Sequence, residues 1–211
     1  MPAARTIRNL SWLLPLAVLA GCGGGAAFSP DGLLLAEARV VAEHRGQLDG
    51  VLNTLFGTPD EPAVPAALAE VLDIEQIRHA AGPVESHRVG ETIGLYRRHC
   101  ARCHGLTGDG QGPTALYQSP YPRDFRAGVF KWKSTTRGAA PLDEDLHATL
   151  ERGIPGTAMP SFRLLKQEER DALVEYVKYL AIRGQTERRL IEHVAEELDY
   201  DPDAGPTPPC L

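Results

Sequence analysis

Sulfur-containing residues, aromatic residues and long apolar runs are all scarce in this chain. Its 211 residues include four cysteines and two methionines, and 6% are aromatic. After residue 20 no apolar run reaches the roughly 20 residues that a spanning helix needs, so any membrane contact is expected at the N-terminus. Positive charge is not in excess either, because the formal net charge is −6. A basic nucleic-acid-binding face is therefore not expected.

The first 21 residues have the features of a signal peptide. Arg5 and Arg8 precede an apolar stretch over residues 10–20, which is too short to span a membrane. The stretch ends in Leu-Ala-Gly-Cys, with Cys22 last, and resembles the lipobox of bacterial lipoproteins. In those proteins the cysteine is acylated and the chain is cut before it. An ordinary secretory signal with an incidental cysteine is the alternative.

Either interpretation places the mature chain outside the cytoplasm. Acyl chains on Cys22 would anchor it to the cell membrane, facing the periplasm or the outside, and residues 22–30 would form a tether. The segment 1–21 carries two arginines and no acid, so its removal changes the net charge from −6 to −8. Cys210, close to the C-terminus, receives no predicted role.

Residues 100–104 read Cys-Ala-Arg-Cys-His, which is the attachment pattern of c-type haem. This composition gives about 0.002 chance matches to the pattern. The alternatives are a thioredoxin-like redox pair and half of a zinc site, but no second cysteine pair completes a zinc site and the surroundings do not resemble a βαβ unit. We expect one haem c, bound covalently by Cys100 and Cys103, with His104 as the axial iron ligand.

A second axial ligand is expected at Met159, the only methionine left after the signal is removed. It follows His104 by 55 residues and lies in a loop, 153–160, with two prolines and two glycines. Such a loop can fix a side chain towards a pocket, although a lone methionine more commonly fills a core. The rival ligands are four histidines, of which the first is the most serious and the others are interpreted as surface residues: His147, His87, His99 and His193.

Periodicity predicts helices through most of the mature chain. The haem domain is expected over 86–184, between a helical extension and a C-terminal region that contains a helix and a Pro-rich, unstructured tail. The extension covers 31–85 and the C-terminal region 185–211. Within the haem domain and the C-terminal region, helices are expected over 90–102, 143–152, 167–183 and 186–198.

The extension must bury an apolar stripe, because an isolated helix of this length is marginal in water. The stripe is formed by Leu48, Val51, Leu52, Leu55 and Phe56. Two surfaces could cover it, the flank of the haem domain or a neighbouring subunit. We favour the subunit, because the extension leaves the anchor and would meet membrane-bound partners first.

Taken together, these residues resemble class I c-type cytochromes of the bacterial mono-haem kind over about residues 88–183. The shared motifs are Leu95-Tyr96, Cys-x-x-Cys-His, the glycine-rich loop ending at Pro113, Pro-Arg-Asp-Phe over 122–125, Met159-Pro160, and the last helix with Leu173 and Tyr176. The resemblance implies an all-α fold around one haem, in which the first and last helices cross. Family members often have glycine eight residues before the first haem cysteine, where this chain has Thr92.

The resemblance also implies further contacts. Leu95 and Tyr96 would pair with Leu173 and Tyr176, and the carbonyl of Pro113 would accept a hydrogen bond from the ring of His104. Cationic or N–H donors would bind the haem propionates. The first candidates are Arg123 and Trp132, followed by Lys131, Lys133 and Arg137.

The expected function is electron transfer, not catalysis, because two protein ligands on the iron leave no position for a substrate. An anchored mono-haem domain resembles the cytochrome subunits of respiratory assemblies such as alternative complex III. We therefore expect redox protein partners, and a place in a larger membrane complex that could be an oxidoreductase. The alternatives are a gas sensor in which a ligand displaces Met159, a structural subunit, and a peroxidase, which would need a second haem.

Overall fold

The computed structural model describes residues 25–88 and 91–198. The predicted signal peptide, Cys22 and the predicted C-terminal tail with Cys210 lie outside these residues. In the described part, no helix combines the length and apolar character needed to cross a membrane. The elements are α1 (Gly32–Glu37), α2 (Ala42–Phe56), η1 (Ala66–Leu68), α3 (Ile74–Ala80), β1 (Glu85–Arg88), β2 (Glu91–Ile93), α4 (Leu95–His99), α5 (Ala101–His104), η2 (Ala115–Tyr117), α6 (Asp143–Arg152) and α7 (Gln167–Leu198).

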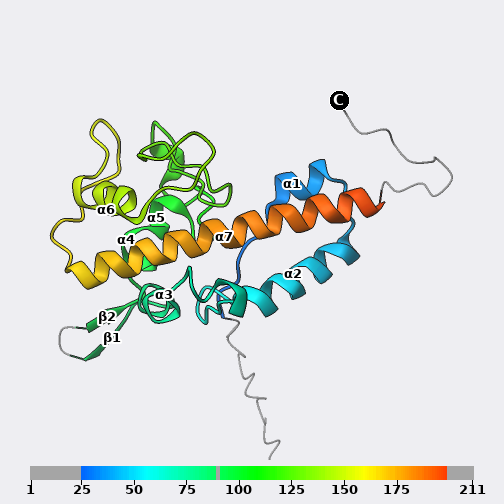
Figure 1. The fold of residues 1–211 in the computed structure, drawn as a ribbon, viewed down its shortest axis with the longest axis horizontal. Coiled ribbons are helices and arrows are strands. Elements are labelled where there is room, and N and C mark those ends of the chain that lie inside the picture. Colours follow the sequence, from blue (N-terminus) through cyan, green and yellow to red (C-terminus); the bar gives the residue numbers. More distant parts are fainter. Residues whose placement is uncertain (1–24, 89–90, 199–211) are drawn as a thin grey trace, which may run out of the picture.

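Helix α7 organises the molecule. Figure 1 shows α4, α5 and α6 along one side of it, and α2 and α3 along the other. The helices α4 and α7 meet through Tyr96 and Tyr176, whose ring centroids are 4.8 Å apart. Leu95 and Leu173 are fully buried in the same core. The predicted all-α class is confirmed, and the crossing of first and last haem-domain helices is present.

The start of the haem-domain helix differs from the prediction. We expected a helix from residue 90, but residues 91–93 form β2, which pairs antiparallel with β1, and α4 begins at Leu95. Gly94 explains the difference, because its φ is +72° and a Cβ there would lie 2.3 Å from the carbonyl oxygen of Pro83. The chain passes so close to Pro83 that only glycine fits, and the helix begins after it.

The C-terminal helices are one helix. We expected a break between residues 183 and 186, whereas α7 continues without interruption for 32 residues. Gly184 is not a terminator here. A Cβ on it would lie 2.4 Å from Cα of Arg126, so the glycine permits close packing of a loop on the helix. The helix therefore runs through the boundary that we placed between the haem domain and the C-terminal region.

The extension packs on its own chain. Our prediction that a neighbouring subunit covers its apolar stripe is therefore wrong. Leu52 and Phe56 are each 1% exposed, and the Tyr179 hydroxyl donates a hydrogen bond to the Phe56 carbonyl. Burial of side chains of this size contributes about 1.5–3 kcal/mol each. A second cluster joins α1 and α2 to the far end of α7 through Leu35, Val40, Leu48 and Ile191. Of the predicted stripe, Val51 is exposed.

Candidate haem site

The Cys-x-x-Cys-His motif forms a tight turn of helix. Cys100 ends α4 and begins α5, and the His104 amide donates to the Cys100 carbonyl at 2.9 Å. The glycine-rich loop then folds back beneath α5, where a Cβ on Gly112 would lie 2.4 Å from the carbonyl oxygen of Arg102. The Tyr96 hydroxyl donates to the Gly105 carbonyl at 2.9 Å and ties this loop to the α4–α7 crossing. The motif is thus held by backbone packing that tolerates no side chain at residue 112.

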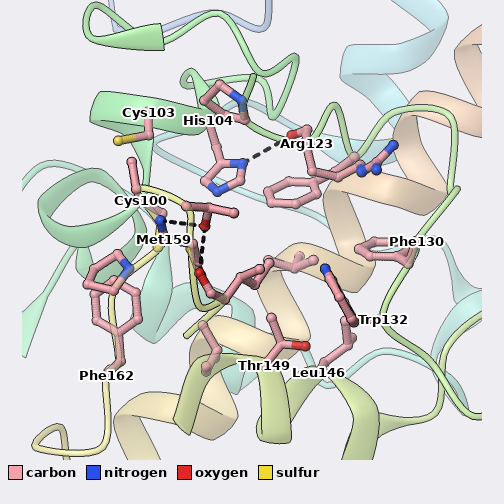
Figure 2. Close-up of a pocket in the computed structure, with 18 of the residues that line it drawn as sticks. Cys100, Cys103, His104, Arg123, Phe130, Trp132, Leu146, Thr149, Met159 and Phe162 are labelled. Carbon is pink, nitrogen blue, oxygen red and sulfur yellow. Dashed lines mark hydrogen bonds between the residues drawn. The ribbon is translucent and has the colours of Figure 1, made fainter. Parts of the chain in front are cut away.

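One cavity of about 270 Å³ brings the predicted ligands together. Both motif cysteines, His104 and Met159 line it, as Figure 2 shows, although Met159 comes from a loop after α6. The rest of the wall is mainly apolar and aromatic, with side chains from four parts of the chain: Phe125, Phe130, Leu146, Leu150, Phe162, Val174 and Val177. A deep apolar wall with a few placed polar groups is typical of a cofactor site.

His104 is oriented by the segment that follows the glycine-rich loop. Its Nδ1 lies 3.0 Å from the carbonyl oxygen of Arg123, and its ring stacks on Phe125 with centroids 4.6 Å apart. A carbonyl only accepts, so Nδ1 carries the hydrogen and Nε2 is left with a lone pair for a metal. Burial lowers the pKa of His104, while the Arg123 carbonyl opposes the shift. The imidazole is therefore held in its ligand form.

The carbonyl in that bond is not the predicted one. Pro113 is exposed and lies outside the cavity wall. The amides on either side of it donate to the helix instead, Gly112 to the Cys103 carbonyl at 3.0 Å and Thr114 to the Arg102 carbonyl at 3.1 Å. These two bonds hold Pro113 against the end of α5. The carbonyl of Arg123, not that of Pro113, therefore accepts the hydrogen bond from His104.

The two cysteines differ in environment, and no disulfide joins them. Cys100 is buried, and burial, with a smaller effect of Cys103, raises the pKa of its thiol to about 12. Cys103 is half-buried and its sulfur accepts a hydrogen bond from the Gln118 amide at 3.0 Å. Both cysteines line the same cavity, as covalent attachment of one haem would require.

Met159 is directed by a loop that closes on itself. Gly153 ends α6 with a φ of +66°, and the Ile154 amide donates to the Met159 carbonyl at 3.1 Å. The Met159 amide donates to Oγ1 of Thr157, also at 3.1 Å, and that hydroxyl donates to the Ile154 carbonyl. The half-buried Met159 side chain packs on the core and lines the cavity.

The rival histidines differ in whether they line the cavity. His147 lies outside the cavity wall, with its Nε2 3.5 Å from a carboxylate oxygen of Asp171, and His193 is exposed. His99, which we interpreted as a surface residue, lines the cavity and meets Phe162 edge-on at 6.0 Å. Burial lowers its pKa. The prediction for His99 was wrong because its helix ends at the cavity rather than in solvent.

Three of the candidate propionate binders reach the cavity. Arg123, Lys131 and Trp132 line it, and Trp132 is 63% exposed and so lies at its mouth. Lys133 is engaged elsewhere, because its ammonium donates to the hydroxyl of Thr135 at 2.9 Å. Arg137 is exposed and outside the wall. Sequence reasoning missed Gln118, whose amide contact with a cysteine sulfur has no recognisable sequence signal.

The residues present fit a haem c. One apolar cavity is lined by two cysteines, a histidine and a methionine. The Nδ1 atom of that histidine, His104, is fixed by its hydrogen bond to the Arg123 carbonyl. This arrangement is the one expected of a c-type cytochrome domain, a class in which haem c is the cofactor and electron transfer the activity.

Comparison with known proteins agrees with this class. Residues 90–177, which contain the Cys-x-x-Cys-His motif and Met159, match the family model described as cytochrome C oxidase, cbb3-type, subunit III. A chain of the Kuenenia stuttgartiensis reducing HAO-like protein complex is 35% identical, with a TM-score of 0.40. The match covers 40% of this chain and 39% of that one. Comparison with curated proteins gives no match.

Proposed function

We propose that this protein is an extracytoplasmic, membrane-anchored carrier of single electrons in a respiratory chain. One haem c is bound covalently by Cys100 and Cys103, with His104 and Met159 as axial ligands. The observation that carries the proposal is the shared cavity, which collects these four side chains from α4, α5 and a distant loop. When bound, the haem supplies a centre that gains and loses one electron reversibly.

The chain's own residues fix that centre and shield it. Arg123 orients the His104 ring through Nδ1, and the closed loop at 153–159 presents the thioether. The aromatic and aliphatic wall excludes water, which with Met/His ligation favours a high reduction potential. With His104 and Met159 both holding the iron, no position would be left for a substrate.

The packing of the extension favours a tethered carrier over a fixed subunit. The stripe that we expected to bind a neighbour is largely covered by α7, on the opposite side of α7 from α4, α5 and α6. Among the described residues of the stripe, Leu52 and Phe56 are covered by this chain and need no permanent partner. The proposed partners are redox proteins of a membrane respiratory complex, and the proposed anchor is the lipid on Cys22.

The test is expression of the full chain with a haem c maturation system. The proposal expects one haem per chain, retained through denaturing electrophoresis and visible as a mass increment. Cys100→Ala with Cys103→Ala should lose it. Haem that dissociates on denaturation would reject covalent binding. Rapid CO binding by the reduced wild-type protein would favour the gas sensor over the carrier.

A further inference from the structure

A strap, residues 26–31, precedes the first helix and is pinned at both ends. The Ala26 amide donates to Oδ2 of Asp60 at 2.6 Å, and the Asp31 amide donates to Oε1 of Glu187 at 2.8 Å. Glu187 is 2% exposed and belongs to the far half of α7. The strap is therefore fixed to the body of the domain before α1 begins.

The middle of the strap is fixed as well. Phe28 is buried, and its ring lies 6.2 Å from that of Tyr179. The Arg183 guanidinium lies 4.2 Å from the centroid of the Phe28 ring and also donates to Glu187 at 3.1 Å. A buried guanidinium that is both stacked and paired resists displacement.

The Asp31 carboxylate reaches the loop that follows the haem motif. Its Oδ2 lies 3.6 Å from Nη1 of Arg126, and both side chains are largely buried. The Arg126 guanidinium in turn makes a bidentate pair with the Asp124 carboxylate. Its Nε donates to Oδ1 at 3.1 Å and its Nη2 donates to Oδ2 at 2.8 Å. Bidentate pairs of this kind fix geometry as well as charge. Together, burial and pairing connect the strap to the segment 123–126.

That same segment contacts the proximal histidine twice. The Arg123 carbonyl accepts from Nδ1 of His104, and the Phe125 ring stacks on the imidazole. Asp124, which Arg126 holds, lies between these two contacts in the chain. A shift of the Asp124 side chain would therefore move both neighbours that orient His104.

We propose that Asp31 and Arg126 are positioning residues for His104. They clamp residues 123–126 so that the Arg123 carbonyl accepts the Nδ1 hydrogen, and the strap thereby sets the electron donation of the imidazole. The proposal rests on the proposed function, since it takes His104 as the axial ligand. A stronger Nδ1 hydrogen bond makes the imidazole a better donor and lowers the haem's reduction potential.

The experiment uses the full haem-loaded chain in three variants. Asp31→Asn removes the carboxylate charge. Arg126→Lys keeps the positive charge but cannot make the bidentate pair with Asp124. Glu37→Gln is the matched control, because it removes one exposed negative charge from the end of α1. The readouts are the exchange rate of the His104 Nδ1 proton by NMR and the reduction potential.

Both test variants should speed exchange of the Nδ1 proton about tenfold or more and raise the potential, while the control matches the wild type. Exchange within about twofold of wild type in Arg126→Lys overturns the proposal, and this variant decides alone if Asp31→Asn does not fold. A change of potential without faster exchange would also overturn it, because that is a long-range charge effect. A wild-type chain without covalent haem would reject the proposed function first.

Discussion

Replacing Phe56 by alanine tests whether the extension is part of the haem domain's fold. Phe56 is 1% exposed at the end of α2, and its ring meets that of Tyr179 at 5.9 Å in an edge-on contact. Truncation of a buried phenylalanine costs about 3–5 kcal/mol in lost transfer energy and cavity formation. For a chain of this size we expect Tm to fall by roughly 6–20 °C.

The assay is thermal and chemical unfolding of the haem-loaded protein, followed by circular dichroism and by haem absorbance. Val51→Ala is the control, because Val51 lies on the same helix and is 45% exposed, so its free energy of unfolding should change by less than about 0.5 kcal/mol. The two signals should move together in Phe56→Ala. A loss below about 1 kcal/mol, or an unchanged haem transition, would show that the extension folds independently of the haem domain.

Three further predictions concern the ligand, the loop packing and the anchor. Met159→Ala should lower the potential and open the reduced iron to CO, as spectroscopy would show. Gly184→Ala should cost about 1–3 kcal/mol in denaturant titrations, because a methyl group there would lie 2.4 Å from Arg126. Gly50→Ala, in open space on α2, should instead stabilise by about 0.5–1 kcal/mol. Cys22→Ser should leave a haem-loaded protein in the soluble extracytoplasmic fraction or stall its processing; normal maturation with tight membrane pelleting would contradict the lipid anchor.

The features of the site that could be predicted from the sequence are those set by neighbouring residues in the chain. The spacing of Cys100, Cys103 and His104 within one helical turn needs no tertiary information, and the irregular loop around Met159 was recognisable from its prolines and glycines. The structure places all four side chains around one cavity. The resemblance also predicted the contact of Tyr96 with the last helix, because two helices that cross have few ways to pair large side chains.

What the sequence did not predict depended on contacts between distant segments. A backbone carbonyl has no signature in the sequence, so nothing distinguished Arg123 from Pro113 as the partner of the proximal histidine. A helix end was expected at residue 183, whereas the helix continues and Gly184 permits close packing on Arg126, 58 residues earlier in the chain. The apolar stripe of α2 required a covering surface, but its own pattern could not identify α7 as that surface.

Residues 100–104 and Met159 are proposed to hold one haem iron together. X-ray absorption at the iron edge of the purified, haem-loaded protein tests this proposal most directly. We expect one sulfur neighbour and a shell of nitrogens in the wild type, with loss of the sulfur in Met159→Ala and its retention in His147→Ala. An all-nitrogen shell in the wild type, or a sulfur neighbour that survives in Met159→Ala, would contradict it.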